Sequence, residues 1–147
     1  MTSISNKTFN GCEALTSIIL PENLNSIGDY AFNGCAGLTS LVIPAGVSSI
    51  GQNALANCTG LKWVVVKDGV SDIAVGADAF SGMPETTILY VPAGKRNEFA
   101  NNSVWSTFKS IIQDDNITFA DSNVKSVCVN NWDTNEDGEL SLVEALM

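Results

Sequence analysis

The residues with the clearest metal-binding chemistry lie near the end of the 147-residue chain, in the segment 133–144. Oxygen-bearing side chains occupy its first, third, fifth and twelfth positions: Asp133, Asn135, Asp137 and Glu144. A hard divalent cation such as calcium takes about six to eight oxygen ligands at short range, and this spacing can supply them from one loop. Gly138 permits the sharp turn that such a loop needs, and Glu139 offers its backbone carbonyl oxygen. The pattern therefore predicts a calcium site formed by Asp133, Asn135, Asp137, Glu139 and Glu144.

This segment resembles an EF-hand or dockerin-like loop, and the terminal glutamate favours the EF-hand. The alternative is an acidic surface turn with chance spacing. Residues 123–132 are expected to form the preceding helix, with Val124, Val127 and Cys128 on one face. Because the chain ends three residues after Glu144, we expect calcium to bind weakly or not at all to this chain and more tightly to one extended past Met147.

Other common chemistries are excluded or disfavoured by composition. The chain has no histidine, which removes the Ser-His-Asp triad, the Cys-His dyad and histidine metal ligands. Its net charge of −9 disfavours nucleic acid as a partner, and no apolar run is long enough to span a membrane. A glycosidase acting through two carboxylates is a minor alternative, but the candidate acids fall at predicted turns: Glu13, Glu22, Asp78 and Glu85. We therefore predict that the chain is not an enzyme.

Three of the four cysteines, Cys12, Cys35 and Cys58, occupy one position of a repeated pattern. We expect them to stack as a column of reduced, mostly buried side chains. A disulfide between neighbouring members of the column is the alternative, and it would leave one thiol unpaired.

The repeated pattern is regular in length. Phe9, Phe32 and Leu55 are evenly spaced, and Phe80 follows after a slightly longer interval. A fixed period of this size, on the order of 20–30 residues, indicates a solenoid in which each coil buries its apolar edge against the next. The apolar spacing Leu-x-x-Leu-x-Leu predicts short parallel strands near residues 17–20, 40–43, 63–66 and 88–91, joined in a right-handed coil.

Three motifs recur in order: Leu-Thr-Ser-Ile-x-Leu-Pro, Ser-Ile-Gly-x-x-Ala-Phe and Asn-Gly-Cys. They resemble the BspA-type (Treponema pallidum type) leucine-rich repeats of bacterial surface proteins over roughly residues 1–92. The resemblance implies an extracellular or bacterial cell-surface location and adhesion to a host or extracellular matrix protein. Residues 2–9 align with residues 25–32, so we expect the chain to begin halfway through a repeat.

The predicted fold class is an α/β repeat solenoid over residues 1–113, followed by a short helical EF-hand-like segment over residues 114–147. Residues 93–113 are expected to form a helical cap, because Trp105, Phe108 and Ile112 recur at helical spacing. Residues 114–147 hold eight acidic residues and one basic residue, which places most of the negative charge around the calcium loop.

Alternation along the predicted strands places a second set of side chains on the outward surface. We predict that this set binds a protein partner: Ile19, Val42, Trp63, Val65 and Tyr90. The alternative is that β-branched residues simply favour strands, which accounts for Val42 and Val65 better than for Trp63 and Tyr90. The chain is thus interpreted as a non-catalytic interaction module, and a structural spacer that presents other domains is the alternative.

Overall fold

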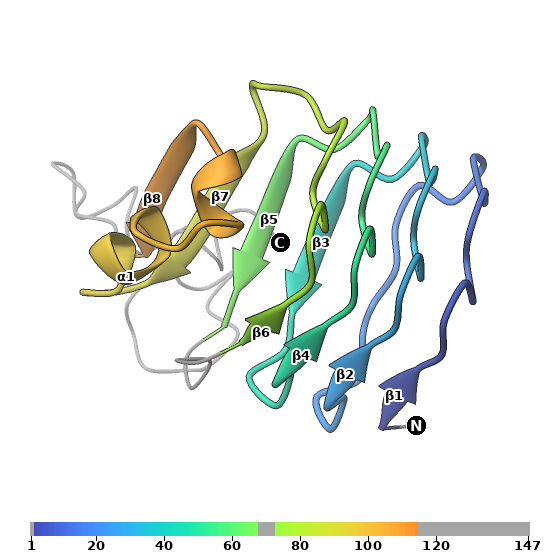
Figure 1. Ribbon diagram of the computed structural model, residues 1–147, viewed down its shortest axis with the longest axis horizontal. Helices are drawn as coiled ribbons and strands as arrows, with labels where there is room; N and C mark the ends of the chain where they lie inside the picture. The colour runs from blue at the N-terminus through green and yellow to red at the C-terminus, as the bar shows by residue number, and fades with distance from the viewer. Residues whose placement is uncertain (1, 68–72, 115–147) are drawn as a thin grey trace, which may run out of the picture.

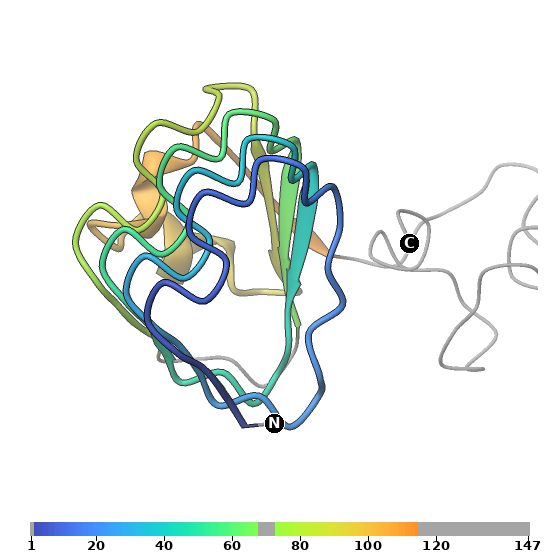
Figure 2. The same ribbon diagram turned by 90° about the vertical axis from the view of Figure 1, so that its right-hand side faces the viewer.

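The computed structural model describes residues 2–67 and 73–114 as a stack of similar coils. Successive coils lie side by side along the long axis of the molecule, from the N-terminal coil to the C-terminal end at β8 (Figure 1). Seen along this axis, the coils superimpose and enclose a common interior (Figure 2). The predicted solenoid is therefore confirmed for this part of the chain.

Four two-residue strands form the first parallel sheet, which crosses one wall of the stack. These strands are β1 (Ser3–Ile4), β2 (Ser26–Ile27), β4 (Ser49–Ile50) and β6 (Ala74–Val75), in that order. Ser3 pairs with Ser26, and Ser26 pairs with Ser49. Residues that pair in this sheet therefore occupy the same position in successive repeats.

Four longer strands form the second parallel sheet on another wall, in the order β3 (Ser40–Ile43), β5 (Trp63–Val66), β7 (Ile88–Pro92) and β8 (Ser110–Asp114). Three of the predicted strands are confirmed here, and parallel pairing joins them in the expected register.

The predicted strand at 17–20 is wrong, because this segment forms no strand. The amide of Thr39 in the next coil donates a hydrogen bond to the carbonyl of Thr16, just before this segment, at 3.2 Å. Ile19 within the segment is 96% exposed. Among the described coils this segment has a neighbouring coil on one side only. Hydrogen bonds to a single neighbouring strand would therefore have to stabilise it as a strand.

The apolar column predicted from the repeat forms the centre of the core. Phe32 and Leu55 are fully buried and Phe80 is nearly so, while Phe9 packs on them from the first coil and is partly buried. The rings of Phe9 and Phe32 are stacked, with centroids 5.2 Å apart. This column places one large side chain in each coil at the same height.

The C-terminal end of the stack is covered by aromatic side chains, but the cap is not the helix that was predicted. A short helix α1 (Arg96–Ala100) and a 3-10 turn η1 (Trp105–Thr107) bring Trp105 and Phe108 onto the Phe80 ring, each with a centroid distance of 4.9 Å. Residues 110–114 instead add to β7 as strand β8. Adjacent β-branched residues at 111 and 112 favour a strand, and the free edge of β7 supplies its partner.

Close approach between coils explains why one turn position is glycine. A Cβ atom added to Gly28 would lie 2.6 Å from the backbone nitrogen of Asn6 in the preceding coil, a distance that no side chain tolerates. At a neighbouring turn position the backbone φ is positive in every described coil, at Lys7, Tyr30, Asn53 and Asp78. No helix in the described residues is long and apolar enough to cross a membrane.

Candidate functional site

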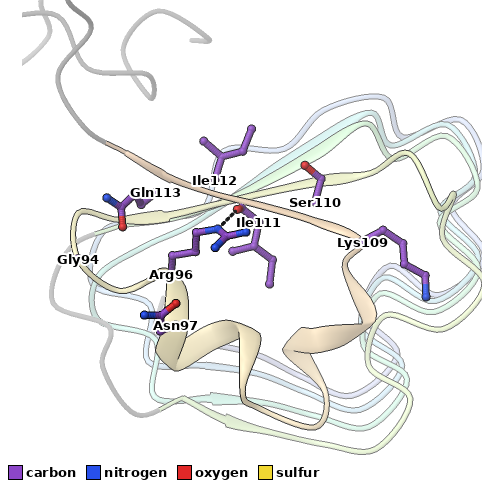
Figure 3. Close-up of a pocket in the computed structure, with 8 residues that line it drawn as sticks. All are labelled: Gly94, Arg96, Asn97, Lys109, Ser110, Ile111, Ile112 and Gln113. Atoms are coloured by element: carbon purple, nitrogen blue, oxygen red, sulfur yellow. Dashed lines mark hydrogen bonds between the residues drawn. The ribbon is translucent and has the colours of Figure 1, made fainter.

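The second sheet presents a continuous surface on the side away from the core. Within each strand alternate side chains point to opposite faces: Leu41, Val64 and Leu89 point into the core cluster. The intervening residues form what we call the outer face: Ser40, Val42, Trp63, Val65, Ile88, Tyr90, Ser110 and Ile112. Figure 3 shows this alternation at β8, where Ser110 and Ile112 point to the opposite side from Ile111.

Parallel register arranges the outer face in two columns. One column contains Ser40, Trp63, Ile88 and Ser110, and the other contains Val42, Val65, Tyr90 and Ile112. The face is therefore apolar along its centre, and serine occupies both ends of one column. None of the eight side chains named above is charged, and β8 ends in an acidic residue, Asp114.

The predicted partner-binding residues differ widely in exposure. Val42 and Trp63 are partly exposed, and Ile19 is 96% exposed but lies in the segment that forms no strand. The prediction that Val65 and Tyr90 are exposed is wrong, because Val65 is fully buried and Tyr90 is only 9% exposed. In register, Val65 lies between Val42 and Tyr90, so side chains flank it on both sides.

The residues predicted from the sequence to bind a partner did not include Ile112, the most exposed apolar side chain of the outer face. It is 37% exposed and extends the Val42 column across β8. The sequence prediction placed Ile112 in the helical cap because of its spacing from Trp105 and Phe108. Ile111 and Ile112 are consecutive β-branched residues, and this pair was the signal for a strand whose side chains alternate between the core and the outer face.

Basic side chains lie beside the outer face. Lys62 and Lys109 immediately precede β5 and β8, and both are exposed. Neither takes part in the ion pairs of the described residues, which join Lys67 to Glu22 and Lys95 to Glu98. Two exposed lysines therefore lie at the N-terminal ends of β5 and β8, next to the start of the outer face.

A shallow pocket lies at the C-terminal edge of the second sheet, beside β8 (Figure 3). Arg96 crosses this edge, and its Nε donates to the carbonyl oxygen of Ile111 at 2.8 Å. Asn97 and Lys109 also line the pocket, and none of its lining residues among those that the structure describes carries a carboxylate. Arg96 and Lys109 give the pocket a positive charge that can attract an anion, and its described lining residues include no nucleophile paired with a base.

The carboxylates considered for a glycosidase do not form such a site. The pocket beside β8 contains none of them, and neither does the open groove along the first sheet, where Asp29 is the acidic residue. Within residues 2–67 and 73–114, no three His, Cys, Asp or Glu side chains gather closely enough to hold a metal ion. Glu22 is instead paired with Lys67, with 2.7 Å between Oε1 and Nζ.

The cysteine column forms as predicted, and its three members are free thiols. Cys35 donates to the Phe9 carbonyl (3.1 Å), and Cys58 donates to the Phe32 carbonyl (3.2 Å). Burial away from water raises the pKa of the Cys58 thiol to about 12, and it also raises the pKa of Cys35. The prediction of burial is wrong for Cys12, which is exposed. It belongs to the first described coil, so the next coil covers it from one side only.

The predicted calcium ligands lie outside the described residues. These are Asp133, Asn135, Asp137, Glu139 and Glu144, and the helix predicted at 123–132 lies outside them as well.

Short strands stacked in parallel, one coil per period, and a column of apolar side chains define a solenoid of the leucine-rich-repeat class. The family model of the BspA type leucine rich repeat region matches residues 1–111 in six copies. The chain therefore belongs to this family, whose members are generally surface or secreted proteins with protein-interaction repeats.

The solved structure of a leucine-rich repeat protein from Bacteroides ovatus ATCC 8483 is similar to this chain, with a TM-score of 0.61 and 28% sequence identity. The similarity covers 76% of this chain and 28% of that protein, so the chain spans less than a third of its length. No curated protein matches the chain.

Proposed function

We propose that the chain is a non-catalytic protein-binding module of a bacterial cell-surface or secreted protein. The observation that carries this proposal is the outer face, an apolar and aromatic surface built on strands that the core holds rigidly. Surfaces of this kind mark interaction sites more often than catalytic ones, and aromatic residues are enriched among those that dominate binding energy. Trp63 is the partly exposed aromatic residue of the outer face.

The proposed partner is a protein, such as a host or extracellular matrix protein. Binding of the chain to a panel of immobilised matrix proteins would identify it by surface plasmon resonance. Trp63→Ala is then expected to weaken binding by at least about 2 kcal/mol, the range of a central aromatic contact. Gln52→Ala is the matched control, because Gln52 is exposed beside the first sheet and its truncation is expected to leave binding unchanged. If both variants bind equally, another surface is responsible.

A structural spacer that presents other domains is the alternative function. It predicts that no protein of the panel binds. It also predicts that neither substitution alters the activity of the longer protein, whereas truncation of the solenoid does.

The loop at 133–144 is proposed to bind calcium in the longer protein, which would make calcium the bound cofactor. This proposal is supported by the spacing of oxygen ligands in the sequence and by the local excess of acidic residues. Calorimetric titration of calcium into a chain extended past Met147 is the test, with Asp133→Ala as the variant. We expect Asp133→Ala to abolish binding and magnesium to compete poorly, because magnesium requires a smaller and stricter octahedron. Equal affinities of the two chains would contradict the assignment.

A further inference from the structure

The pocket beside β8 contains an arginine without a charged partner among the described residues. Arg96, at the start of α1, donates from Nε to the carbonyl oxygen of Ile111 at 2.8 Å. Its two Nη atoms make no hydrogen bond or ion pair with a described residue. The bond from Nε therefore holds the guanidinium group in place and leaves the N–H donors of both Nη atoms for a ligand.

The charges in this pocket favour an anionic ligand. The lining residues that the structure describes carry two positive charges, on Arg96 and Lys109, and no negative one. Asp114 ends β8 and is not among these residues. Figure 3 shows Arg96 and Asn97 towards one end of the pocket and Lys109 at the other end. A guanidinium group binds a carboxylate through two parallel hydrogen bonds, which makes a carboxylate the matching ligand for Arg96.

The strand that borders the pocket has an open edge, since β8 is the last strand of the second sheet in the described part of the chain. The Ile88 amide donates to the Lys62 carbonyl on the β5 side, so the next residue of β7, Leu89, presents its backbone to β8. Leu89 pairs with Ile111, and in a parallel pair only one of the two paired residues bonds across. The amide and carbonyl of Ile111 therefore face away from β7, at the edge where Arg96 meets the carbonyl.

We infer that this pocket binds an extended acidic peptide of a protein partner, which adds to the open edge of β8 and places a carboxylate on Arg96. The pocket has a volume of about 720 Å³, within the roughly 300–1,000 Å³ of sites that take ligands much larger than a single small anion. Acidic residues two positions apart in an extended chain lie on one face, about 7 Å from each other. A second carboxylate of the peptide is therefore expected near Lys109.

The pocket adjoins the outer face, because Ser110 and Ile112 line the pocket and also belong to that face. The inference thus deepens the proposed function by giving the protein partner an acidic, extended segment. Only this link rests on the proposed function, since an isolated peptide in the pocket needs no contact with Trp63. Trp63→Ala is expected to leave the affinity for the peptide unchanged, so the two proposals can fail separately.

Titration of the full chain followed by nuclear magnetic resonance tests the inference. The probe is the peptide Thr-Glu-Val-Glu-Thr, blocked at both ends, and the matched probe has glutamine in place of both glutamates. We expect the acidic peptide to shift the signals of the Ile111 amide and the Arg96 Nε, and to bind about tenfold or more tightly than the glutamine peptide. Arg96→Ala should lower its affinity about tenfold or more, and Arg96→Lys should not restore it, because an ammonium group cannot form the paired hydrogen bonds. Lys109→Ala is expected to cause a smaller loss that shrinks in high salt.

Lys62→Ala is the matched control, since it removes an exposed positive charge that does not line the pocket, and we expect it to leave the affinity unchanged. Asn97→Asp adds a negative charge at an exposed lining residue without removing the Arg96 side chain, so it should also weaken binding. It keeps the test decisive if the Arg96 variants fail to fold, which melting curves from circular dichroism establish.

The inference is overturned if neither peptide binds, or if both bind equally, which would leave Arg96 the role of blocking the open edge of β8. It is also overturned if Lys62→Ala weakens binding as much as Arg96→Ala, because attraction to the acidic peptide would then be unspecific. Acetate or inorganic phosphate that binds as tightly as the acidic peptide would overturn it as well, since the pocket would then be a site for free anions.

Discussion

Truncation of Phe32 to alanine should cause one of the largest losses of stability that a single substitution can produce in this chain. Phe32 is fully buried, its ring stacks on Phe9 of the preceding coil with centroids 5.2 Å apart, and its amide donates to the Ala54 carbonyl of the following coil at 2.7 Å. Removal of a buried phenylalanine side chain costs about 3–5 kcal/mol, because the loss of transfer free energy is added to that of an unfilled cavity. Two coils rather than one lose packing, so we expect a value within this range.

Urea unfolding followed by circular dichroism measures the effect. With a slope of about 2 kcal/mol/M, a loss of this size shifts the midpoint by about 1.5–2.5 M. Phe9→Ala removes a partly buried ring and is expected to cost less, about 1–2 kcal/mol. In the double variant the two changes should be non-additive by about 0.5–1.5 kcal/mol, the value of an aromatic pair.

Ile19→Ala is the control for this series, because Ile19 is 96% exposed and its truncation should change stability by no more than about 0.5 kcal/mol. If Phe32→Ala shifts the midpoint no further than Ile19→Ala, the argument from the stacked column is wrong.

Further predictions concern the thiols and one turn. At pH 8, iodoacetamide should modify Cys12 readily and Cys58 at least about a thousandfold more slowly, since a pKa of about 12 leaves almost no thiolate; peptide mass spectrometry measures both rates. Because folded Cys58 keeps its proton while the unfolded thiol ionises near pH 8.5, the free energy of unfolding should be constant below that pH and fall as the pH rises towards 12. Cys58→Ala should make this alkaline decline less steep in urea unfolding, and an unchanged slope would count against the burial of the thiol. Asn53 has a φ of +53°, so Asn53→Val should lower the free energy of unfolding by about 1–2 kcal/mol, whereas Asn53→Gly should stay within about 0.5 kcal/mol; equal effects would contradict a strained turn.

The repeat made much of the fold predictable. A side chain that recurs once in every period, such as Phe9 and Phe32, must lie at the same height of successive coils, and the strand pairs of both sheets follow the same period. The alternation that sends Leu41 inward and Val42 outward is equally local, since it depends only on the period of a strand.

The candidate surface was less predictable, because exposure depends on neighbours that are remote in the sequence. Alternation assigned Ile19 and Val65 to the same outward surface, yet one is 96% exposed and the other is fully buried. The difference arises because β5 has a paired strand on each side, whereas Ile19 lies in a segment that pairs with none among the described residues.

Tertiary contacts also decided the structure at the C-terminal end of the solenoid. The spacing of Trp105 and Phe108 correctly predicted aromatic residues that cover the core, but it could not show that residues 110–114 leave the helical pattern. A strand requires a partner edge, which β7 supplies only after the preceding coils have stacked. The sequence by itself thus determined the period, the inward-facing residues and the alignment of the cysteines in one column, because these depend on local periodicity. Only the tertiary structure decided which outward residues meet water, because that depends on the strands assembled on either side.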